Sequence, residues 1–229
     1  MTESSINPIP VDHWAQQSPI SIVHADAFRI VVRAGYLTVR YSEKPVSGQF
    51  VGEQGHRKFE IRKPSPSHSV ALDHATANLV QIHLHAPSEH EIDGSKRRGE
   101  IHLVHEIVDP RLGSTMIVLG VFFDVKDAQA KRAFFDTWAK ASSMAKASGD
   151  DVEIHPASLL PEDCEQWYLY EGSRTSKPTR ELVTWIVFPT SLDVASDDLR
   201  KIEQHAHQHG REIQPLNRRH VLRNFERRG

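Results

Sequence analysis

The chain has 229 residues, of which 38% are hydrophobic and 25% charged, as expected for an ordinary globular protein that can fold as one large domain. The net charge of −2 gives no reason to expect a nucleic acid or an anionic membrane as a partner, and no segment approaches the roughly 20 apolar residues of a membrane-spanning helix. Cys164 is the only cysteine, so no disulfide can form within the chain. Because a secretory signal is also lacking at the start, we expect a cytoplasmic location, or a periplasmic or secreted one if a leader was removed.

Residues 1–16 are polar, contain two prolines and predict an irregular N-terminal arm, followed by one domain over residues 17–229. Strands are predicted where short runs rich in β-branched and aromatic residues alternate with turn signals. In chain order these runs are 28–33, 37–41, 59–62, 79–86, 100–108, 116–125 and 182–188. The run 116–125 is almost wholly apolar, which predicts a central strand buried on both faces.

Two segments have helical periodicity. Residues 127–148 carry Ala, Lys and Phe at helical spacing, and Phe134, Phe135 and Trp138 form an apolar stripe, which predicts a helix packed on the sheet. Residues 196–207 predict a short helix with Ser196 as its N-cap and acidic residues in its first turn. The predicted fold class is therefore mostly β, with peripheral helices.

The histidines at 83, 85 and 102 form the most informative pattern in the chain. Side chains two residues apart on a strand share a face, so Gln81, His83 and His85 share one face of one strand, and Glu100 and His102 share one face of the next. If these strands are antiparallel neighbours, the three imidazoles converge. Three imidazoles with an open fourth position are typical of a catalytic zinc site. Gln81 and Glu100 are placed to hold the imidazole nitrogens that face away from the metal.

These residues resemble the α-class carbonic anhydrases. The resemblance extends from about Gln17 to Phe225, nearly the whole chain, and the histidine pattern is its most specific part. Its further motifs are Gln17–Ile22, Ser88–His90, Val118–Gly120, Leu159–Pro161, Tyr170–Thr175, Val183–Trp185 and Gln214–Asn217 with Arg219. The resemblance implies a single domain with a large, twisted, mainly antiparallel central sheet, with the metal at the base of a conical cleft.

The resemblance also implies an activity and its residues. Zn²⁺ held by His83, His85 and His102 would provide zinc-bound hydroxide for the reversible hydration of CO2 to bicarbonate. Thr175, hydrogen-bonded to Glu89, would orient that hydroxide, because an ionised carboxylate can only accept hydrogen bonds. An apolar wall would hold CO2, and the residues that match it are Val104, Val118, Val183 and Trp185.

A proton must also move from the site to solvent, and a histidine titrates in the right pH range for this step. His56, in Gln54–His56, resembles the segment that carries the family's proton shuttle. The apolar residues that follow, Phe59 and Ile61, are displaced by one position from the family's usual phase. The shuttle assignment to His56 is therefore a prediction with an imperfect match.

The sequence departs from the family at several positions in the cleft. Arg174 replaces a leucine of the pocket wall, Lys177 replaces the first of two prolines before Pro178, and Ala86 replaces a tryptophan. A guanidinium beside an apolar pocket would either turn outward or reshape the site and favour bicarbonate or a carboxylate-bearing substrate. Two alternatives therefore stay open at this stage. One is a binding protein with the same fold and little activity, and the other is a zinc hydrolase whose anionic substrate is held by Arg174 and Lys177. The oligomeric state is also open, a dimer included.

Overall fold

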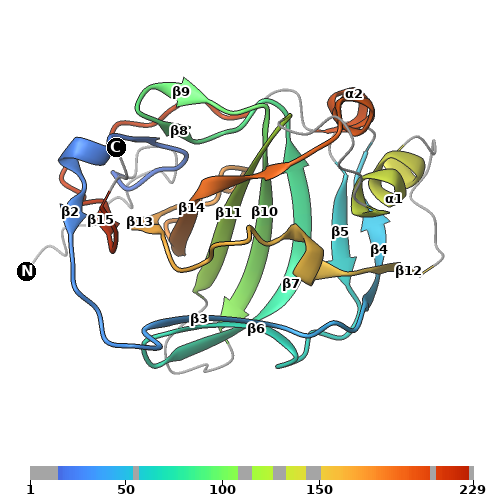
Figure 1. The fold of residues 1–229 in the computed structure, drawn as a ribbon, viewed down its shortest axis with the longest axis horizontal. Coiled ribbons are helices and arrows are strands. Elements are labelled where there is room, and N and C mark those ends of the chain that lie inside the picture. Colours follow the sequence, from blue (N-terminus) through green and yellow to red (C-terminus); the bar gives the residue numbers. More distant parts are fainter. Residues whose placement is uncertain are drawn as a thin grey trace, which may run out of the picture.

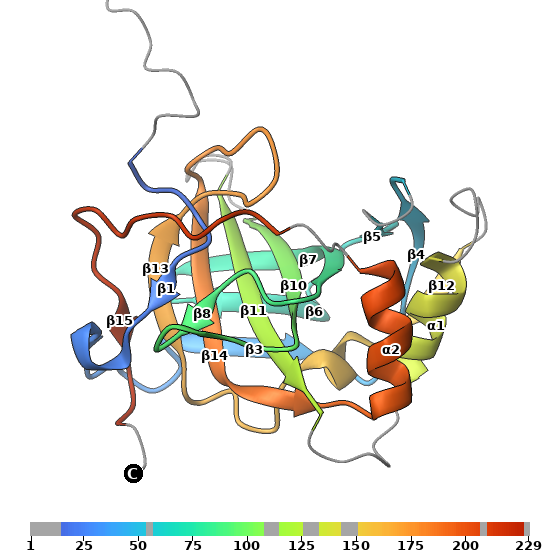
Figure 2. The ribbon, with the colours of Figure 1, turned by 90° about the horizontal axis from the view of Figure 1, so that it is seen from above.

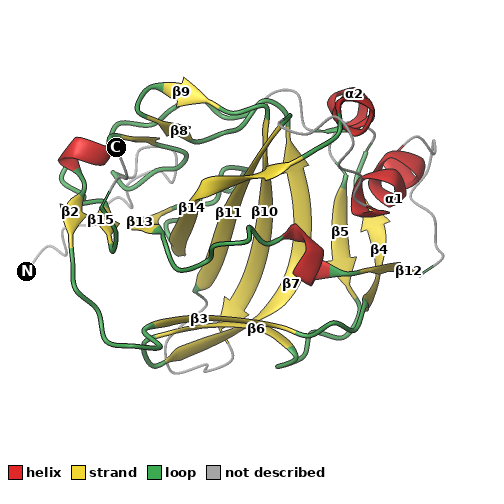
Figure 3. Ribbon diagram, in the orientation of Figure 1, coloured by secondary structure: helices red, strands yellow, loops and turns green. Residues whose placement is uncertain are grey.

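The structure is a computed structural model that describes residues 15–53, 57–107, 115–125, 133–142, 151–206 and 210–226. Most of the predicted N-terminal arm lies outside these ranges, so the domain boundary at residue 17 stays a prediction. Strands dominate the described residues, and the α-helices among them are α1 (Ala133–Ser142) and α2 (Ser196–His205) (Figure 3). The predicted mostly-β fold class is therefore confirmed. No helix in the described part of the chain is long and apolar enough to cross a membrane.

The strands form a large sheet and a small one (Figure 1). Their bounds are β1 (Ser21–Ile22), β2 (Phe28–Arg29), β3 (Leu37–Tyr41), β4 (Val46–Val51), β5 (Lys58–Ile61), β6 (His68–Leu72), β7 (Ala75–His85), β8 (Glu91–Ile92), β9 (Ser95–Lys96), β10 (Gly99–Ile107), β11 (Met116–Asp124), β12 (Val152–Ile154), β13 (Tyr168–Gly172), β14 (Val183–Asp193) and β15 (Leu222–Arg223). The 12-stranded sheet has the order β12-β4-β5-β7-β10-β11-β14-β13-β15-β2, and off this path β6 pairs with both β7 and β3 in antiparallel fashion. Strands β1, β8 and β9 form the small sheet.

Most neighbouring strands of the large sheet are antiparallel, as the resemblance implied. The parallel pairs are β11 with β14 and β15 with β2, so the sheet is mixed rather than uniform. Strand β11 is buried at every position from Ile117 to Phe123, which confirms the prediction of a central strand covered on both faces. A strand that is covered on both faces is expected to be apolar at almost every position, because neither face meets solvent.

The central strands separate two apolar clusters. Ile82 and Leu84 of β7 and Ile101 and Leu103 of β10 are fully buried in the larger core. On the opposite face, Val118 and Trp185 belong to a second cluster with the N-terminal segment. Because alternate residues on a strand point to opposite faces, His83 and His85 of β7 and His102 of β10 lie on the face of the second cluster. A slip of one residue in this pairing would move them into the larger core.

Both helices lie at the end of the large sheet that carries β4 and β5 and pack beside each other (Figure 2). Phe134, Phe135 and Trp138 of α1 are buried in the larger core, as their spacing predicts. The capping prediction for α2 is wrong. Ser196 is the first helical residue, and Ala195 is the N-cap, with no side-chain capping hydrogen bond. The acidic residues Asp197 and Asp198 do lie in the first turn, where they face the positive end of the helix dipole.

Several strand predictions differ from the structure at their ends. The run 28–33 contributes only Phe28–Arg29, whereas the run 182–188 is part of the longer β14 (Val183–Asp193). Strands β4 and β6 were not among the predicted runs, and in β4 Gly48 stands at a position of the inward-facing side. A Cβ at Gly48 would lie 2.6 Å from Cζ of Phe59, so the glycine makes room for a packed ring of the neighbouring strand. Packing between neighbouring strands therefore determines that position 48 is a glycine, and a pattern within one strand does not show such packing.

His105 is a buried histidine that the sheet keeps uncharged. Its Nε2 lies 2.7 Å from the hydroxyl of Tyr41, and its Nδ1 lies 3.1 Å from the carbonyl oxygen of Ile117. Burial lowers the pKa of His105 from 6.5 to about 4, although the backbone hydrogen bonds to Ile117 and Leu103 oppose the shift. Unfolding would therefore allow protonation between these two values. The difference corresponds to roughly 3 kcal/mol of stability present above pH 6.5 and lost as the pH falls toward 4.

We predict that replacing His105 with glutamine removes much of the loss of stability between pH 6.5 and 4. The free energy of unfolding, measured by urea titration at several pH values, should fall less steeply with decreasing pH in His105→Gln than in the parent. His74, whose side chain is 89% exposed, provides the control, and His74→Gln should keep the parent's slope. Equal slopes in His105→Gln and the parent would contradict the assignment.

Candidate metal centre and active site

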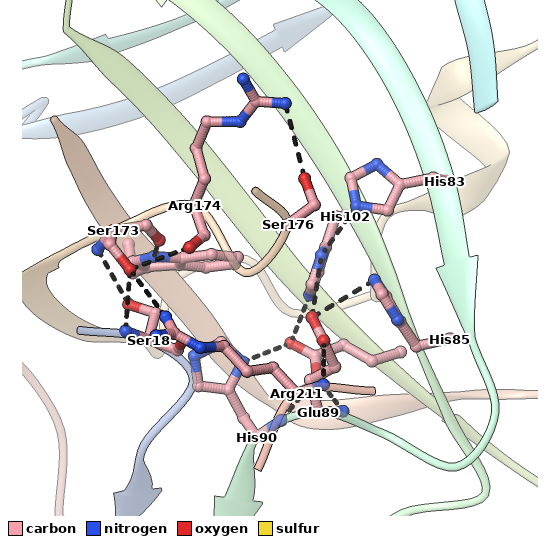
Figure 4. Close-up of polar contacts among 12 residues, drawn as sticks. Ser18, His83, His85, Glu89, His90, His102, Ser173, Arg174, Ser176 and Arg211 are labelled. Carbon is pink, nitrogen blue, oxygen red and sulfur yellow. Dashed lines mark hydrogen bonds and ion pairs between the residues drawn. The ribbon is translucent and has the colours of Figure 1, made fainter. Parts of the chain in front are cut away.

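Strands β7 and β10 bring three histidines to one place. They pair as antiparallel neighbours, which confirms the predicted pairing, and the register sets His83 opposite His102, His85 opposite Glu100, and Gln81 opposite Val104. Side chains directly opposite each other in an antiparallel pair lie on the same face and close together. Ligand atoms of His83, His85 and His102 all lie within 4.8 Å of one another (Figure 4).

The orientation of the rings suits a shared metal. Nδ1 of His102 lies 3.1 Å from Nε2 of His83, so these two nitrogens face a common point. Two nitrogens bound to zinc at 2.0–2.1 Å in tetrahedral geometry lie roughly 3.3 Å apart. Imidazole nitrogens are good zinc ligands, and three of them leave a fourth position open. The residues present therefore fit a catalytic zinc ion, with Nδ1 of His102 and Nε2 of His83 directed at the metal position.

Glu100 holds the far side of His102. Its Oε1 lies 3.1 Å from Nε2 of His102, which leaves Nδ1 of this ring directed toward the other histidines. Its Oε2 accepts hydrogen bonds from the backbone N–H groups of Glu89 and His90, at 3.0 and 2.9 Å. Gly120 makes room for the carboxylate, since a Cβ there would lie 2.8 Å from Oε1 of Glu100.

The electrostatics keep this buried carboxylate ionised. Burial raises the pKa of Glu100, but the charges of His90 and His102 and the hydrogen bonds from them outweigh it and hold the pKa well below the usual range. Burial lowers the pKa of His102, but the charge of Glu100 and the hydrogen bond to it reverse that shift, so the pKa of His102 is raised. A carboxylate–histidine pair of this kind fixes ring orientation and makes the ligand more basic.

A buried chain of polar groups behind Glu100 was missed by the sequence analysis. Nδ1 of His90 lies 2.7 Å from Oε1 of Glu100, and Nε2 of His90 lies 2.6 Å from the Tyr170 hydroxyl. That hydroxyl lies 2.9 Å from Oγ of Ser18, which in turn accepts the backbone N–H of Ser173 at 3.1 Å. These hydrogen bonds connect the N-terminal segment, the residue before β8, and β13 to the carboxylate of Glu100. The motifs that contain these residues were recognised, but their contacts were not.

Arg211 and Glu89 form a second long-range contact beside the histidines. The backbone N–H of Arg211 donates to Oε1 of Glu89 at 2.9 Å, and its guanidinium donates to Oε1 of Gln17 at 2.8 Å. The other oxygen of Glu89, Oε2, lies 3.3 Å from Nε2 of His85. Glu89 is 2% exposed, so this carboxylate is buried at the metal position.

Thr175 lines the same cavity as His83 and His102. Within the described residues, it makes no hydrogen bond with Glu89, so the structure places the two expected partners near the site without joining them. Gln81 also lines the cavity, and its side chain makes no hydrogen bond to His83 in the described part of the chain. The shuttle candidate His56 lies outside the described residues and stays a prediction.

The cavity of about 180 Å³ in front of the histidines has a largely apolar wall. It is lined by His83, His102, Thr175 and the four expected wall residues Val104, Val118, Val183 and Trp185. Val118, Val183 and Trp185 are buried and contribute to the second apolar cluster as well. The same side chains therefore serve both packing and the pocket wall. Ala86, where the family has a tryptophan, is buried in the larger core and does not line this cavity.

The basic residues of the loop after β13 have different positions. Arg174 is half-buried and lines the cavity, and its Nη2 donates to Oγ of Ser176 at 3.4 Å (Figure 4). Lys177 is exposed and is not among the residues that line the cavity. The hydrolase alternative needed both cations at the substrate, and this arrangement supports only Arg174. Lys58 of β5, opposite His83 in the sheet, was not singled out from the sequence.

Comparisons with known proteins agree with this architecture. The family model described as eukaryotic-type carbonic anhydrase matches residues 8–225. A carbonic anhydrase of Nesocodon mauritianus is 31% identical over 75% of this chain and 63% of its own length, and one of Klebsiella pneumoniae is 30% identical over 90% and 79%. The match to a carbonic anhydrase of a Nostoc strain covers 58% of that relative, so the chain spans less than two thirds of some relatives it matches.

Two solved structures are also similar. The α-carbonic anhydrase of Thermovibrio ammonificans, in complex with the inhibitor sulfanilamide, has a TM-score of 0.73 and 30% identity, covering 91% of this chain and 87% of that one. The α-carbonic anhydrase of Photobacterium profundum has a TM-score of 0.72 and 27% identity, covering 92% and 90%. The fold and the family match therefore define an α-type carbonic anhydrase scaffold. The chain belongs to the eukaryotic-type carbonic anhydrase family.

We predict that Glu100→Gln weakens zinc binding by about 10- to 100-fold, because the amide does not supply the charge that orients His102 and raises its basicity. Zinc affinity would be measured by competition with a chromogenic chelator. Glu153, exposed on β12 and absent from the cavity lining, provides a matched control, and Glu153→Gln should bind zinc like the parent. Unchanged affinity in Glu100→Gln, with a native circular dichroism spectrum, would refute the role of Glu100.

Proposed function

We propose that this chain is a zinc-dependent carbonic anhydrase that catalyses the reversible hydration of CO2 to bicarbonate. The convergence of His83, His85 and His102, two of which (His83 and His102) line a cavity with a largely apolar wall, is the observation that carries the proposal. Membership of the family supports it, and the names of the relatives agree with it. A binding protein without activity would not need this combination, since an intact set of ligands is retained beside a cavity for a small apolar molecule.

Each residue of the site has a definable task in this reaction. Zinc held by three neutral imidazoles would lower the pKa of a water molecule to about 7 and so supply the nucleophile at neutral pH. His83, His85 and His102 bind the ion, and Glu100 fixes the ring of His102. Val104, Val118, Val183 and Trp185 exclude water and offer CO2 an apolar surface.

Thr175 and Glu89 would orient the nucleophile. The Oε1 atom of Glu89 is occupied by the backbone N–H of Arg211, which leaves Oε2 directed toward the histidines. A hydroxyl that donates to an ionised carboxylate can only accept in its other hydrogen bond, so Thr175 would accept a hydrogen bond from the attacking group and thereby fix the direction of that group's lone pair. This task needs Thr175 to approach Glu89 more closely than in the present conformation.

The test of the proposed function is zinc content together with CO2 hydration measured by stopped flow. The purified, zinc-loaded protein should hydrate CO2 well above the buffer rate. His83→Ala should lose both stoichiometric zinc and activity, because two imidazoles do not complete the site. His74→Ala, a replacement of an exposed histidine, should retain both. A parent protein that binds one zinc per chain and shows no hydration above buffer would contradict the proposal and favour the binding-protein alternative.

Replacing Thr175 separates orientation from metal binding. We expect Thr175→Val to lower kcat/KM for CO2 hydration by about 100-fold, since one oriented hydrogen bond is lost at the reacting group. Zinc content should stay unchanged, because Thr175 is not a ligand. Thr175→Ser keeps the hydroxyl and should restore most of the activity. Equal activity in Thr175→Val and Thr175→Ser would show that the hydroxyl plays no part.

A further inference from the structure

Two cationic side chains lie on the histidine side of the sheet and have no task in the chemistry above. Lys58 stands opposite His83 in the pairing of β5 with β7, so both side chains point to the same face. Its neighbours Phe59 and Ile61 are buried in the larger core on the other face, as the alternation of a strand requires. Lys58 itself is half-buried rather than fully exposed.

Arg174 approaches the same region from the loop after β13. It lines the cavity that contains His83, His102 and Thr175, and its guanidinium donates to the hydroxyl of Ser176. Burial lowers the pKa of Lys58, and the positive charge of Arg174 lowers it further, although Glu60 opposes the shift. His83 is a shared neighbour of the two cations, since Lys58 stands opposite it in the sheet and Arg174 lines the cavity that His83 also lines.

Neither cation is neutralised by a salt bridge to another described residue. Glu60, two residues along β5, and Glu106, which lines the cavity beside Met116, are the carboxylates near these two cations, and neither makes an ion pair with Lys58 or Arg174 among the described residues. Two like charges on half-buried side chains repel each other, and an anion between them relieves that repulsion. A guanidinium also offers a planar fork of donors that matches a carboxylate.

We propose that Lys58, Arg174 and the Ser176 hydroxyl form an anion-binding subsite in the cleft, separate from the three histidines, for bicarbonate or another small carboxylate. This inference rests on the proposed function and deepens it, because bicarbonate is the anionic product of the reaction. The subsite holds the anion by charge beside the apolar pocket that holds CO2. One cleft thus contains separate surfaces for the neutral and the charged partner of the same reaction.

The test uses a pair of ligands that differ in charge. Sulfanilamide is bound as an inhibitor in the structure of the Thermovibrio relative, so aromatic sulfonamides are suitable probes of this cleft. We would measure the affinity of the zinc-loaded, full-length protein for 4-sulfamoylbenzoate and for its neutral amide by isothermal titration calorimetry at low salt. The ratio of the two affinities reports how strongly the cleft favours a carboxylate.

We expect the parent to bind the carboxylate about three to ten times more tightly than the amide, the range that one or two partly exposed ion pairs supply. Lys58→Gln and Arg174→Leu should each reduce this ratio toward one, and the ratio corrects for any effect of the variant on the affinity that both ligands share. Lys177→Gln removes an exposed cation of the same loop and should keep the parent's ratio. A ratio near one in the parent, or a ratio that survives in both Lys58→Gln and Arg174→Leu, overturns the subsite.

A second measurement separates failure of the subsite from failure of the proposed function. Binding of neither sulfonamide would contradict the zinc site, and the subsite is then decided by the line broadening of ¹³C-bicarbonate with the same four proteins. Broadening by the parent and Lys177→Gln, but less by Lys58→Gln and Arg174→Leu, supports the subsite. Equal broadening by all four proteins overturns it. Circular dichroism on each variant verifies that it is folded.

Discussion

The buried carboxylate of Glu100 connects almost every part of the site. It accepts two backbone N–H groups from the turn after β7, and it faces the imidazoles of His90 and His102. A buried charge is costly unless it is fully paired, so the sequence around it has little freedom. Gly120 must be small, the turn must present two amides, and the histidines must face inward. The position of the candidate zinc ligand His102 follows from these requirements.

The sheet supplies the precision that such a site needs. His83, His85 and His102 lie on two long, central, antiparallel strands whose opposite faces are packed with fully buried aliphatic side chains. Because a slip of one residue would exchange histidines for leucine and isoleucine, burial fixes the register and thereby the spacing of the imidazoles. A metal site built on such strands is more rigid than one built on loops. Thr175 and Arg174 lie instead in the loop between β13 and β14.

The cleft combines two kinds of surface. Its wall from β10, β11 and β14 is apolar and shares side chains with the second cluster, whereas Arg174 and Lys58 bring positive charge to the same side of the sheet. A leucine at position 174, as in the family pattern, would extend the apolar wall and would leave Lys58 without a second positive charge nearby. The arginine therefore changes what the cleft can hold without touching the candidate metal ligands. Such a change would alter specificity while the proposed chemistry of the site is retained.

The local sequence was enough to predict the site's central part. The alternation of Gln81–His85 and Glu100–Val104 predicts shared faces, and the antiparallel pairing that was assumed for these strands is the one that β7 and β10 adopt. Strand periodicity is a local property, so it can be read from neighbouring residues. The apolar run of β11 and the stripe of α1 were predicted for the same reason. The missed strand β4 and the wrong N-cap of α2 are cases in which packing or backbone geometry, rather than residue type, decides.

Contacts between distant segments were decided only by the tertiary structure. His90 meets Tyr170 across 80 residues, and Glu89 meets Arg211 across 122 residues, and no periodic pattern links these pairs. The same holds for the second cation of the cleft. The sequence indicated Lys177, a near neighbour of Arg174 in the loop, whereas the sheet register brings Lys58 from β5 to the histidine face. Proximity in the chain did not determine proximity in the cleft, because the pairing of β5 with β7 and the path of the loop are set by the packing of the whole sheet.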